Sequence, residues 1–257
     1  MNSAASLLEL RGLSVHFSGV RALADVSFHA HAGEVRAVIG PNGAGKTTLF
    51  NAITGYVEPT AGKVLLRGDE IQGLSPAVVS RRGIRRTFQN GGLFGDLTVL
   101  ENVLCGLHSR IASGFFGLLL GGRSAARAER EAVAKARGLL DLMGIRELEN
   151  RVTKDLSAGQ QRVVEITRAL STDAPLLLLD EPAVGLTPSV RDQLVDVVRR
   201  LAGERGIGVL LIEHSIDMVM KAADVIVVLS GGQAVAEGKP DEIRRNKQVL
   251  DAYLGYE

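Results

Sequence analysis

Eight consecutive residues, 40–47, have the types and spacing of a loop that binds phosphate. They read Gly-Pro-Asn-Gly-Ala-Gly-Lys-Thr and match the pattern G-x-x-x-x-G-K-[ST]. The glycines let backbone N–H groups curl around phosphate oxygens, and a helix that starts near Lys46 directs its positive end at the same charge. We expect Lys46 to reach the β- and γ-phosphates of a nucleotide, and the Thr47 hydroxyl to bind Mg²⁺.

A second set of residues, 176–181, is an apolar run that ends in two carboxylates. The four leucines at 176–179 predict a buried parallel strand. Asp180, at the end of this strand, is expected to hold Mg²⁺ through water, and Glu181 to polarise the attacking water as general base. Acidic residues often follow hydrophobic strands, so this pair indicates hydrolysis only because a phosphate-binding loop occurs in the same chain.

Two other polar residues are ambiguous when each is taken alone. Gln89 stands in Arg-Thr-Phe-Gln-Asn (86–90). Considered without the other motifs, a glutamine at this position indicates only a solvated loop residue. His214 follows an expected strand at 209–212 and Glu213, and a lone histidine there is a surface residue that caps the strand. A further segment, Leu-Ser-Ala-Gly-Gln (156–160, the signature segment), stands just before an expected helix.

The elements that must position these residues alternate between strand and helix at both ends of the chain. From Ser75 the pattern changes to helices, expected at 99–108 and 125–143, and from Pro175 the alternation returns. The layout predicts a parallel α/β core interrupted by a helical insertion. The expected strands are 7–13, 26–31, 35–39, 62–67, 70–71, 176–179, 209–212 and 225–229, and the expected core helices are 46–54, one from Pro188, and 216–222.

Composition is that of an ordinary globular protein and excludes several classes. Of the 257 residues, 46% are hydrophobic and 23% charged, and the net charge of +1 provides no global field for nucleic acid or an anionic membrane. No apolar run approaches the length needed to span a bilayer, and the start of the chain lacks the features of a secretory signal. An apolar, Gly-rich stretch at 111–122 is either a loop or core segment, or a docking surface for a membrane partner.

Taken together and in this order, these motifs resemble the ATP-binding cassette (ABC) ATPases over essentially the whole chain. A closer likeness is to the ATP-binding subunits of branched-chain (hydrophobic) amino-acid importers, the LivG type. ATPases for urea or amide import and for lipopolysaccharide export are similar. The residues that carry the likeness are 40–51, Arg-Thr-Phe-Gln-Asn (86–90), Leu-Thr-Val-Leu-Glu-Asn-Val (97–103), Ser-Ala-Gly-Gln-Gln-Arg (157–162), Ile-Glu-His (212–214) and Ala-Tyr-Leu-Gly (252–255).

The resemblance implies an α/β fold of the P-loop NTPase class, with a RecA-like parallel sheet core, an N-terminal antiparallel β subdomain and an inserted α-helical subdomain. The expected organisation is one nucleotide-binding domain over residues 1–257. Its α/β core with the β subdomain is expected at about 1–88 and 163–257, and its helical subdomain, with the signature segment, at about 89–162.

The resemblance also implies ATP and Mg²⁺ as cofactors and assigns site residues. Phe17 is expected to stack on adenine, and Ser157 and Gly159 to contact the γ-phosphate bound by the opposite subunit, aided by a helix after Gln160. The implied nucleotide-binding residues are Phe17, Gly40, Pro41, Asn42, Gly43, Ala44, Gly45, Lys46, Thr47, Thr48, Ser157, Gly159 and Gln160; the catalytic residues are Glu181, His214 and Gln89; the metal-binding residues are Thr47, Gln89 and Asp180.

The implied partners are transmembrane permease subunits, a second cassette (an identical copy or a paralogue) and, indirectly, a periplasmic substrate-binding protein, with no nucleic acid. Residues 88–94 and the helix after them resemble the groove that receives a membrane subunit, and the implied location is cytoplasmic, peripheral on the inner face of the membrane. Two departures from the family pattern stand out: Ala158 replaces a common Gly in the signature segment, and Thr187 stands where many relatives have Asp. The cargo is not encoded in this chain.

Two other classes explain the motifs less well. Soluble ABC proteins that act on DNA carry long coiled coils between the phosphate loop and the signature segment, and those that act on ribosomes carry two cassettes, whereas this chain has neither. A GTPase would need Asn-Lys-x-Asp, but the nearest run, Asn-Lys-Gln-Val (246–249), lacks the acid, and a small-molecule kinase leaves the signature segment unexplained.

Overall fold

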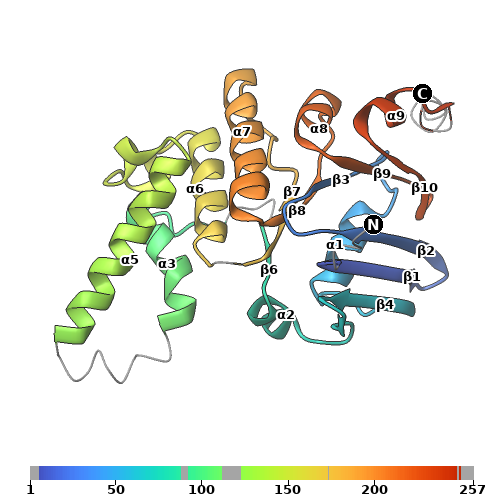
Figure 1. Cartoon of the computed structure of the whole chain (residues 1–257), viewed down its shortest axis with the longest axis horizontal. Coiled ribbons are helices and arrows are strands. Elements are labelled where there is room, and N and C mark those ends of the chain that lie inside the picture. The colour runs from blue at the N-terminus through green and yellow to red at the C-terminus, as the bar shows by residue number, and fades with distance from the viewer. Residues whose placement is uncertain (1–5, 88–91, 112–122, 173, 248, 250–257) are drawn as a thin grey trace. The chain divides into compact units, whose positions relative to one another are not determined.

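The computed structural model describes residues 6–87, 92–111, 123–172, 174–247 and 249, and in 108–111 and 123–126 the backbone alone. Contacts between Cα atoms divide the chain into two compact units. The first comprises Met1–Arg86, Pro175–Ala183 and Arg191–Glu257, and the second comprises Thr87–Ala174 and Val184–Val190. Figure 1 shows the helices and strands of both units.

A six-stranded sheet forms the centre of the first unit, in the order β10-β9-β3-β8-β7-β6. Five of these strands, β3, β6, β7, β8 and β9, run parallel to one another. The sixth, β10, pairs antiparallel with β9. Every residue of β3, β7 and β8 is buried, as in parallel sheets that are covered on both faces. The bounds are β3 Val35–Ile39, β6 Ile84–Arg86, β7 Leu176–Asp180, β8 Gly208–Ile212, β9 Val225–Ser230 and β10 Gln233–Gly238.

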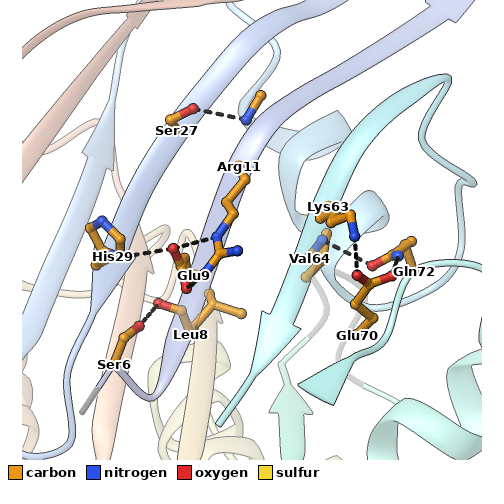
Figure 2. A network of polar contacts seen from close by, with 11 residues as sticks. Ser6, Leu8, Glu9, Arg11, Ser27, His29, Lys63, Val64, Glu70 and Gln72 are labelled. Atoms are coloured by element: carbon orange, nitrogen blue, oxygen red, sulfur yellow. Dashed lines mark hydrogen bonds and ion pairs between the residues drawn. The ribbon is translucent and has the colours of Figure 1, made fainter. Parts of the chain in front are cut away.

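The first unit also contains a four-stranded antiparallel sheet in the order β2-β1-β4-β5. One face is apolar, and the other carries the network of polar contacts in Figure 2, where Arg11 donates to both carboxylate oxygens of Glu9 at 2.6 and 2.8 Å. His29 lies 3.8 Å from Glu9, its cross-strand partner, and Lys63 pairs with Glu70. The bounds are β1 Leu8–Phe17, β2 Val20–Ala30, β4 Ala61–Leu66 and β5 Asp69–Glu70.

Helix α1 (Lys46–Ile53) packs into the hydrophobic core of the first unit. Its Leu49, Phe50 and Ile53 are almost fully buried and belong to one cluster that also includes residues from both sheets. The remaining helices with residues in this unit are α2 Pro76–Arg82, α7 Pro188–Arg205, α8 Ile216–Ala222 and α9 Pro240–Arg244. The phosphate-binding loop therefore lies between a fully buried strand and a buried helix.

The second unit contains the helices α3 (Val99–Ile111), α5 (Arg123–Leu142) and α6 (Ala158–Leu170), with short 3₁₀ turns at Arg146–Leu148 and Thr153–Asp155. Figure 1 shows α3, α5 and α6 in green and yellow. Among the described residues no helix combines the length and the apolar character that crossing a membrane requires.

Asn102, on α3, is fully buried and organises the loop that precedes this helix. Its Oδ1 accepts from the Phe94 N–H at 2.9 Å, and its Nδ2 donates to the carbonyl oxygens of Phe94 and Thr98, both at 3.1 Å. Thr153 also donates to the Phe94 carbonyl, at 2.9 Å. The exposed ring of Phe94 lies 5.8 Å from the Arg168 guanidinium.

The expected α/β architecture, with a mostly parallel sheet and a separate antiparallel sheet, is confirmed. Strand β3 and helix α8 have the predicted limits. The first two strands are longer than predicted, because their pairing continues through a mixture of buried and exposed residues to a tight turn at Ser18 and Gly19, which have φ of 41° and 92°. The helical subdomain was expected to end at about residue 162, which lies inside α6. The whole of α6 belongs to the second unit, which continues to Ala174.

Among the described strands and α-helices, β10 and α9 were not predicted, and neither were α2 and β6. Residues 75–86 contain four arginines and no clear helical or strand period, so the local pattern did not reveal them. Strand β6 has three residues and forms by pairing with β7, which is far away in the sequence.

Candidate nucleotide-binding and catalytic site

Two positions in the loop between β3 and α1 can be occupied only by glycine. Gly45, the residue before α1, has φ 99°, and a Cβ atom there would lie 2.5 Å from the Ala22 carbonyl oxygen. At Gly40 a Cβ atom would lie 2.2 Å from the Leu229 carbonyl oxygen. Neighbouring strands therefore enclose the loop so closely that side chains at these positions are excluded.

Lys46 is the cationic group of this loop, and its side chain folds back over it. Its Nζ donates to the carbonyl oxygens of Gly40 at 2.7 Å and Pro41 at 2.9 Å, and the residue is only 6% exposed. Burial lowers the pKa of Lys46, while the carboxylates of Glu181 and Asp180 act in the opposite direction. A buried ammonium whose partners are neutral carbonyl groups suits an anion, so these residues fit the phosphates of a nucleotide.

Thr47 and Thr48 follow Lys46 in the first turn of α1. Thr47 is exposed and Thr48 is partly buried, so the Thr47 side chain is open to a ligand at the helix N-terminus. Pro41, Asn42 and Gly43 line the outer part of the loop and are not buried, whereas Ala44 is.

Asp180 lies at the C-terminal end of β7, and its carboxylate is paired with Arg86 of β6. The Nη2 atom of Arg86 donates to Oδ2 of Asp180 at 2.7 Å, and Asp180 is 3% exposed. The described residues contain no group of three or more His, Cys, Asp or Glu side chains that could hold a metal by themselves. Mg²⁺ is commonly held by one or two protein groups, with water and substrate phosphates as the other ligands, so Asp180 and Thr47 fit this ion.

Glu181 is the next residue along the chain and pairs with His214. The carboxylate Oε1 of Glu181 lies 2.9 Å from Nε2 of His214. Glu181 has φ 48°, a left-handed conformation that is uncommon for a non-glycine residue, and its N–H donates to the Ile212 carbonyl at 2.9 Å. The turn after β7 is therefore held against the end of β8, and this brings the two side chains together.

Glu213 was not predicted as a site residue, yet it connects the turns after β7 and β8. It is 2% exposed, and its Oε1 accepts from the Ala183 N–H at 2.6 Å. Its Oε2 accepts from the N–H groups of His214 at 3.0 Å and Ser215 at 3.2 Å. The one signal in the sequence is a carboxylate directly after a wholly apolar strand.

Phe17 lies at the end of β1, beside the hairpin turn to β2, and is 46% exposed. Ala22 and Leu23 of β2 are the residues that enclose Gly45. The hairpin thus adjoins the phosphate-binding loop and presents an aromatic ring to solvent. Gln89 lies outside the described residues, as does the tail at 252–255.

In the second unit, Ser157 caps the N-terminus of α6 with a reciprocal pair of hydrogen bonds. Oγ of Ser157 accepts from the Gln160 N–H at 3.3 Å, and Oε1 of Gln160 accepts from the Ser157 N–H at 3.0 Å. The helix begins at Ala158, so the expectation that it starts after Gln160 is wrong. The physical reason is this capping box, which starts the helix inside the signature segment and gives Gly159 and Gln160 places in its first turn.

Two family models match the chain. One, described as ABC transporter, matches residues 23–184, and the other, described as branched-chain amino acid ATP-binding cassette transporter, matches residues 235–257. The chain belongs to the ABC transporter family.

Relatives within the ABC transporter family match along nearly the whole chain. The high-affinity branched-chain amino acid transport ATP-binding protein BraF of Pseudomonas aeruginosa is 42% identical, with 97% of this chain and 98% of the relative covered. LivG of Escherichia coli, described in the same words, is 41% identical with the same coverage. A probable LivG of Archaeoglobus fulgidus is 36% identical, with 97% and 95% covered.

Solved ABC transporter cassettes have the same fold. A nucleotide-free ATP-binding cassette superposes with a TM-score of 0.83 at 33% identity and covers 96% of this chain and 98% of the other. The ADP conformation of an ATP-binding cassette gives a TM-score of 0.81 at 30% identity, with 97% and 99% covered. A bacterial cassette solved as a dimer gives 0.77 at 26% identity, with 91% and 98% covered.

Proposed function

We propose that this chain binds and hydrolyses ATP, with Mg²⁺, to power an importer of branched-chain or other hydrophobic amino acids. The observation that carries the catalytic part is the Glu181–His214 pair, in the same compact unit as the phosphate-binding loop. The importer and its cargo are supported by the transport function for which BraF and LivG are named and by the match of residues 235–257. Because cargo contacts lie on other subunits, this part rests on relatives alone.

In this mechanism the loop and α1 bind the phosphates. Backbone N–H groups at the helix N-terminus and the Lys46 ammonium neutralise the β- and γ-phosphate charge, and Phe17 stacks on the adenine. Thr47 and Asp180 are the residues that would hold Mg²⁺, and the bound ion would supply charge neutralisation at the transferred phosphoryl group. The enclosed glycines and the carbonyl contacts of Lys46 define the shape of this loop.

Glu181 is the general base of the reaction. Its carboxylate accepts a proton from the attacking water, and His214, 2.9 Å away, orients that carboxylate and contacts the γ-phosphate. Gln89 senses the γ-phosphate and the metal and couples them to the helical part of the chain. The strained φ at Glu181 fits a residue that the surrounding structure holds in position for chemistry.

The signature segment acts on the ATP of a second cassette. Ser157, Gly159 and Gln160 form the first turn and cap of α6, whose N-terminal N–H groups attract negative charge. The dimeric bacterial cassette among the structural relatives supports an arrangement of two such chains. The second cassette is a copy of this chain or a paralogue.

The other partners are transmembrane permease subunits and, through them, a periplasmic substrate-binding protein. The exposed Phe94 and the loop that Asn102 organises are the described part of the surface proposed to receive a permease subunit. The chain then acts in the cytoplasm, peripheral on the inner face of the membrane, with no nucleic acid. ATPases for urea or amide import or lipopolysaccharide export are the alternatives within the family, and a soluble non-transport ATPase is the alternative outside transport.

The test of the catalytic part is Glu181→Gln, with Glu204→Gln on the exposed face of α7 as the matched control. We expect Glu181→Gln to retain ATP binding and lose at least about a hundredfold in Mg²⁺-dependent ATPase rate, because it removes the general base. The control should hydrolyse ATP like the wild type. A wild-type rate in Glu181→Gln would disprove the mechanism.

The cargo is tested with the chain, the second cassette and the permease subunits reconstituted in vesicles, with the substrate-binding protein added. ATP-driven uptake of radiolabelled leucine, isoleucine or valine, absent with Glu181→Gln, is the expected result. Uptake of urea or amides in place of these amino acids would replace the proposed cargo.

A further inference from the structure

Arg86 occupies an unusual position for a charged residue. It is the last residue of β6, the edge strand of the parallel sheet, and its side chain is 6% exposed. Its Nη2 atom donates to Oδ2 of Asp180 at 2.7 Å, and the Asp180 side chain is 4% exposed. An ion pair this deeply buried costs free energy to desolvate, so its geometry must be supported by further contacts.

Further contacts come from α1, the helix that begins with Lys46, and from Thr54, the residue that follows it. The Nη1 atom of Arg86 donates to Oδ1 of Asn51 at 2.6 Å and lies 3.4 Å from Oγ1 of Thr54. The guanidinium carbon is 5.4 Å from the centre of the Phe50 ring. One guanidinium therefore connects the phosphate-binding helix to the carboxylate at the end of β7.

This arrangement has two consequences for Asp180. The full positive charge of Arg86 offsets the cost of keeping a carboxylate ionised where little water reaches it. The short bond to Oδ2 also restrains the plane of the carboxylate. Mg²⁺ demands nearly octahedral geometry, so a ligand with a restrained orientation binds it better than a mobile one.

We propose that Arg86 is the positioning residue that presents Asp180 to the Mg²⁺ of bound MgATP. The proposal rests on the function proposed above and deepens it, because it adds to the metal site a residue that does not touch the metal. Arginine is required because a lysine carries the charge but lacks the planar fork of donors that reaches Asp180 and Asn51 together.

The test compares nucleotide affinity with and without metal. A fluorescent, non-hydrolysable ATP analogue is titrated into each variant in Mg²⁺ and in EDTA, and the ratio of the two dissociation constants measures the gain that Mg²⁺ provides. For Arg86→Met we expect this gain to fall about tenfold or more, as when the outer partner of a metal ligand is removed, while affinity in EDTA stays within about twofold of wild type. Arg86→Lys should recover part of the gain.

Arg36 offers a matched control within the same sheet. Its side chain is 5% exposed, pairs with Glu34 at 2.8 Å and lies 5.7 Å from the centre of the Phe28 ring. Arg36 is as buried as Arg86 and is likewise paired with a carboxylate. Its described hydrogen bonds and ion pairs do not involve the residues proposed to bind nucleotide or metal, so Arg36→Met removes a comparable arginine away from the site. It should lower thermal stability and leave the Mg²⁺ gain unchanged.

Asp180→Asn completes the design. If Arg86 acts through Asp180, the double variant Arg86→Met/Asp180→Asn should lose no more of the Mg²⁺ gain than Asp180→Asn alone. An additive loss, or an equal loss in Arg36→Met, would overturn the proposal, as would a wild-type gain in Arg86→Met. If Arg86→Met does not fold, Arg86→Lys decides by the same ratio, and a wild-type ratio there overturns the proposal.

The failure of this inference differs from the failure of the proposed function. If the wild type itself shows no Mg²⁺-dependent nucleotide binding or hydrolysis, the proposed function fails. If the wild type shows both and Arg86→Met is unchanged, only the role of Arg86 fails.

Discussion

The carboxylate of Glu181 and the ring of His214 meet at 2.9 Å, although one residue follows β7 and the other follows β8 by way of Glu213. Glu213 supplies the connection. Its buried carboxylate accepts three backbone N–H groups, one from the turn after β7 and two from the turn after β8. The proposed catalytic pair is therefore connected through a third side chain, whose described hydrogen bonds go to backbone N–H groups.

Replacing Glu213 should disturb catalysis more than nucleotide binding. Glu213→Ala leaves three N–H groups without their acceptor, which should destabilise the protein by about 3 kcal/mol and displace His214. We expect kcat to fall about ten- to a hundredfold with little change in the KM for ATP, because small displacements of catalytic groups are costly. Steady-state ATPase assays measure both values. Asp217→Asn, at the exposed start of α8, is the control, and an unchanged kcat in Glu213→Ala would contradict the prediction.

Two glycines of the phosphate-binding loop should respond differently to alanine. Gly43 and Gly45 both have positive φ, of 78° and 99°, but a Cβ atom at Gly43 meets nothing within 4 Å, whereas at Gly45 it meets Ala22 and Leu23 within 3 Å. Gly43→Ala should therefore cost about 1 kcal/mol of backbone strain, and Gly45→Ala about 3 kcal/mol or more. Urea denaturation without nucleotide measures both, and equal losses would show that packing at Gly45 is unimportant.

Asn102 should be essential to the stability of the second unit. Asn102→Leu keeps the size of the side chain but removes the acceptor of the Phe94 N–H and the donor to two carbonyl groups. We expect a loss of about 3 kcal/mol and faster amide hydrogen exchange in residues 94–98. Asn150→Leu, at an exposed position in the same unit, should lose far less. Equal stability of the two variants would refute the role of Asn102.

The network in Figure 2 should make stability depend on pH in the acid range. The hydrogen bond from Arg11 lowers the pKa of Glu9. Since the folded-state pKa lies below the unfolded-state value, the stabilisation is complete above the unfolded-state pKa and is lost as pH falls through the folded-state pKa. The wild type should therefore have a larger unfolding free energy than Glu9→Gln at neutral pH, and this difference should vanish in strong acid. Denaturation curves at several pH values measure it.

The control for this prediction is Glu58→Gln, an exposed carboxylate outside the network. Its difference from wild type should vary less with pH. A Glu9→Gln difference that stays constant from neutral pH to strong acid would exclude a stabilising Glu9 carboxylate.

Sequence patterns predicted the elements that are specified by residues close to one another in the chain. The loop at 40–47 needs only closely spaced glycines, a lysine and a following helix, and β3 and α8 are recognisable from their own residues. The capping box at Ser157 is also contiguous, although its effect on the start of α6 became visible only in the structure. Strand β6 was missed because three residues carry no period and its stability comes from β7.

The sequence by itself determined the family, the phosphate-binding loop and which acids end β7. Tertiary structure alone decided that Arg86 pairs with Asp180, that Glu213 joins two turns and that His214 reaches Glu181. These pairs are separated by 94, 30 and 33 residues for Arg86–Asp180, Ala183–Glu213 and Glu181–His214. They meet because β6, β7 and β8 are parallel neighbours, so that their C-terminal ends share one edge of the sheet, a relationship that depends on strand order and not on spacing along the chain.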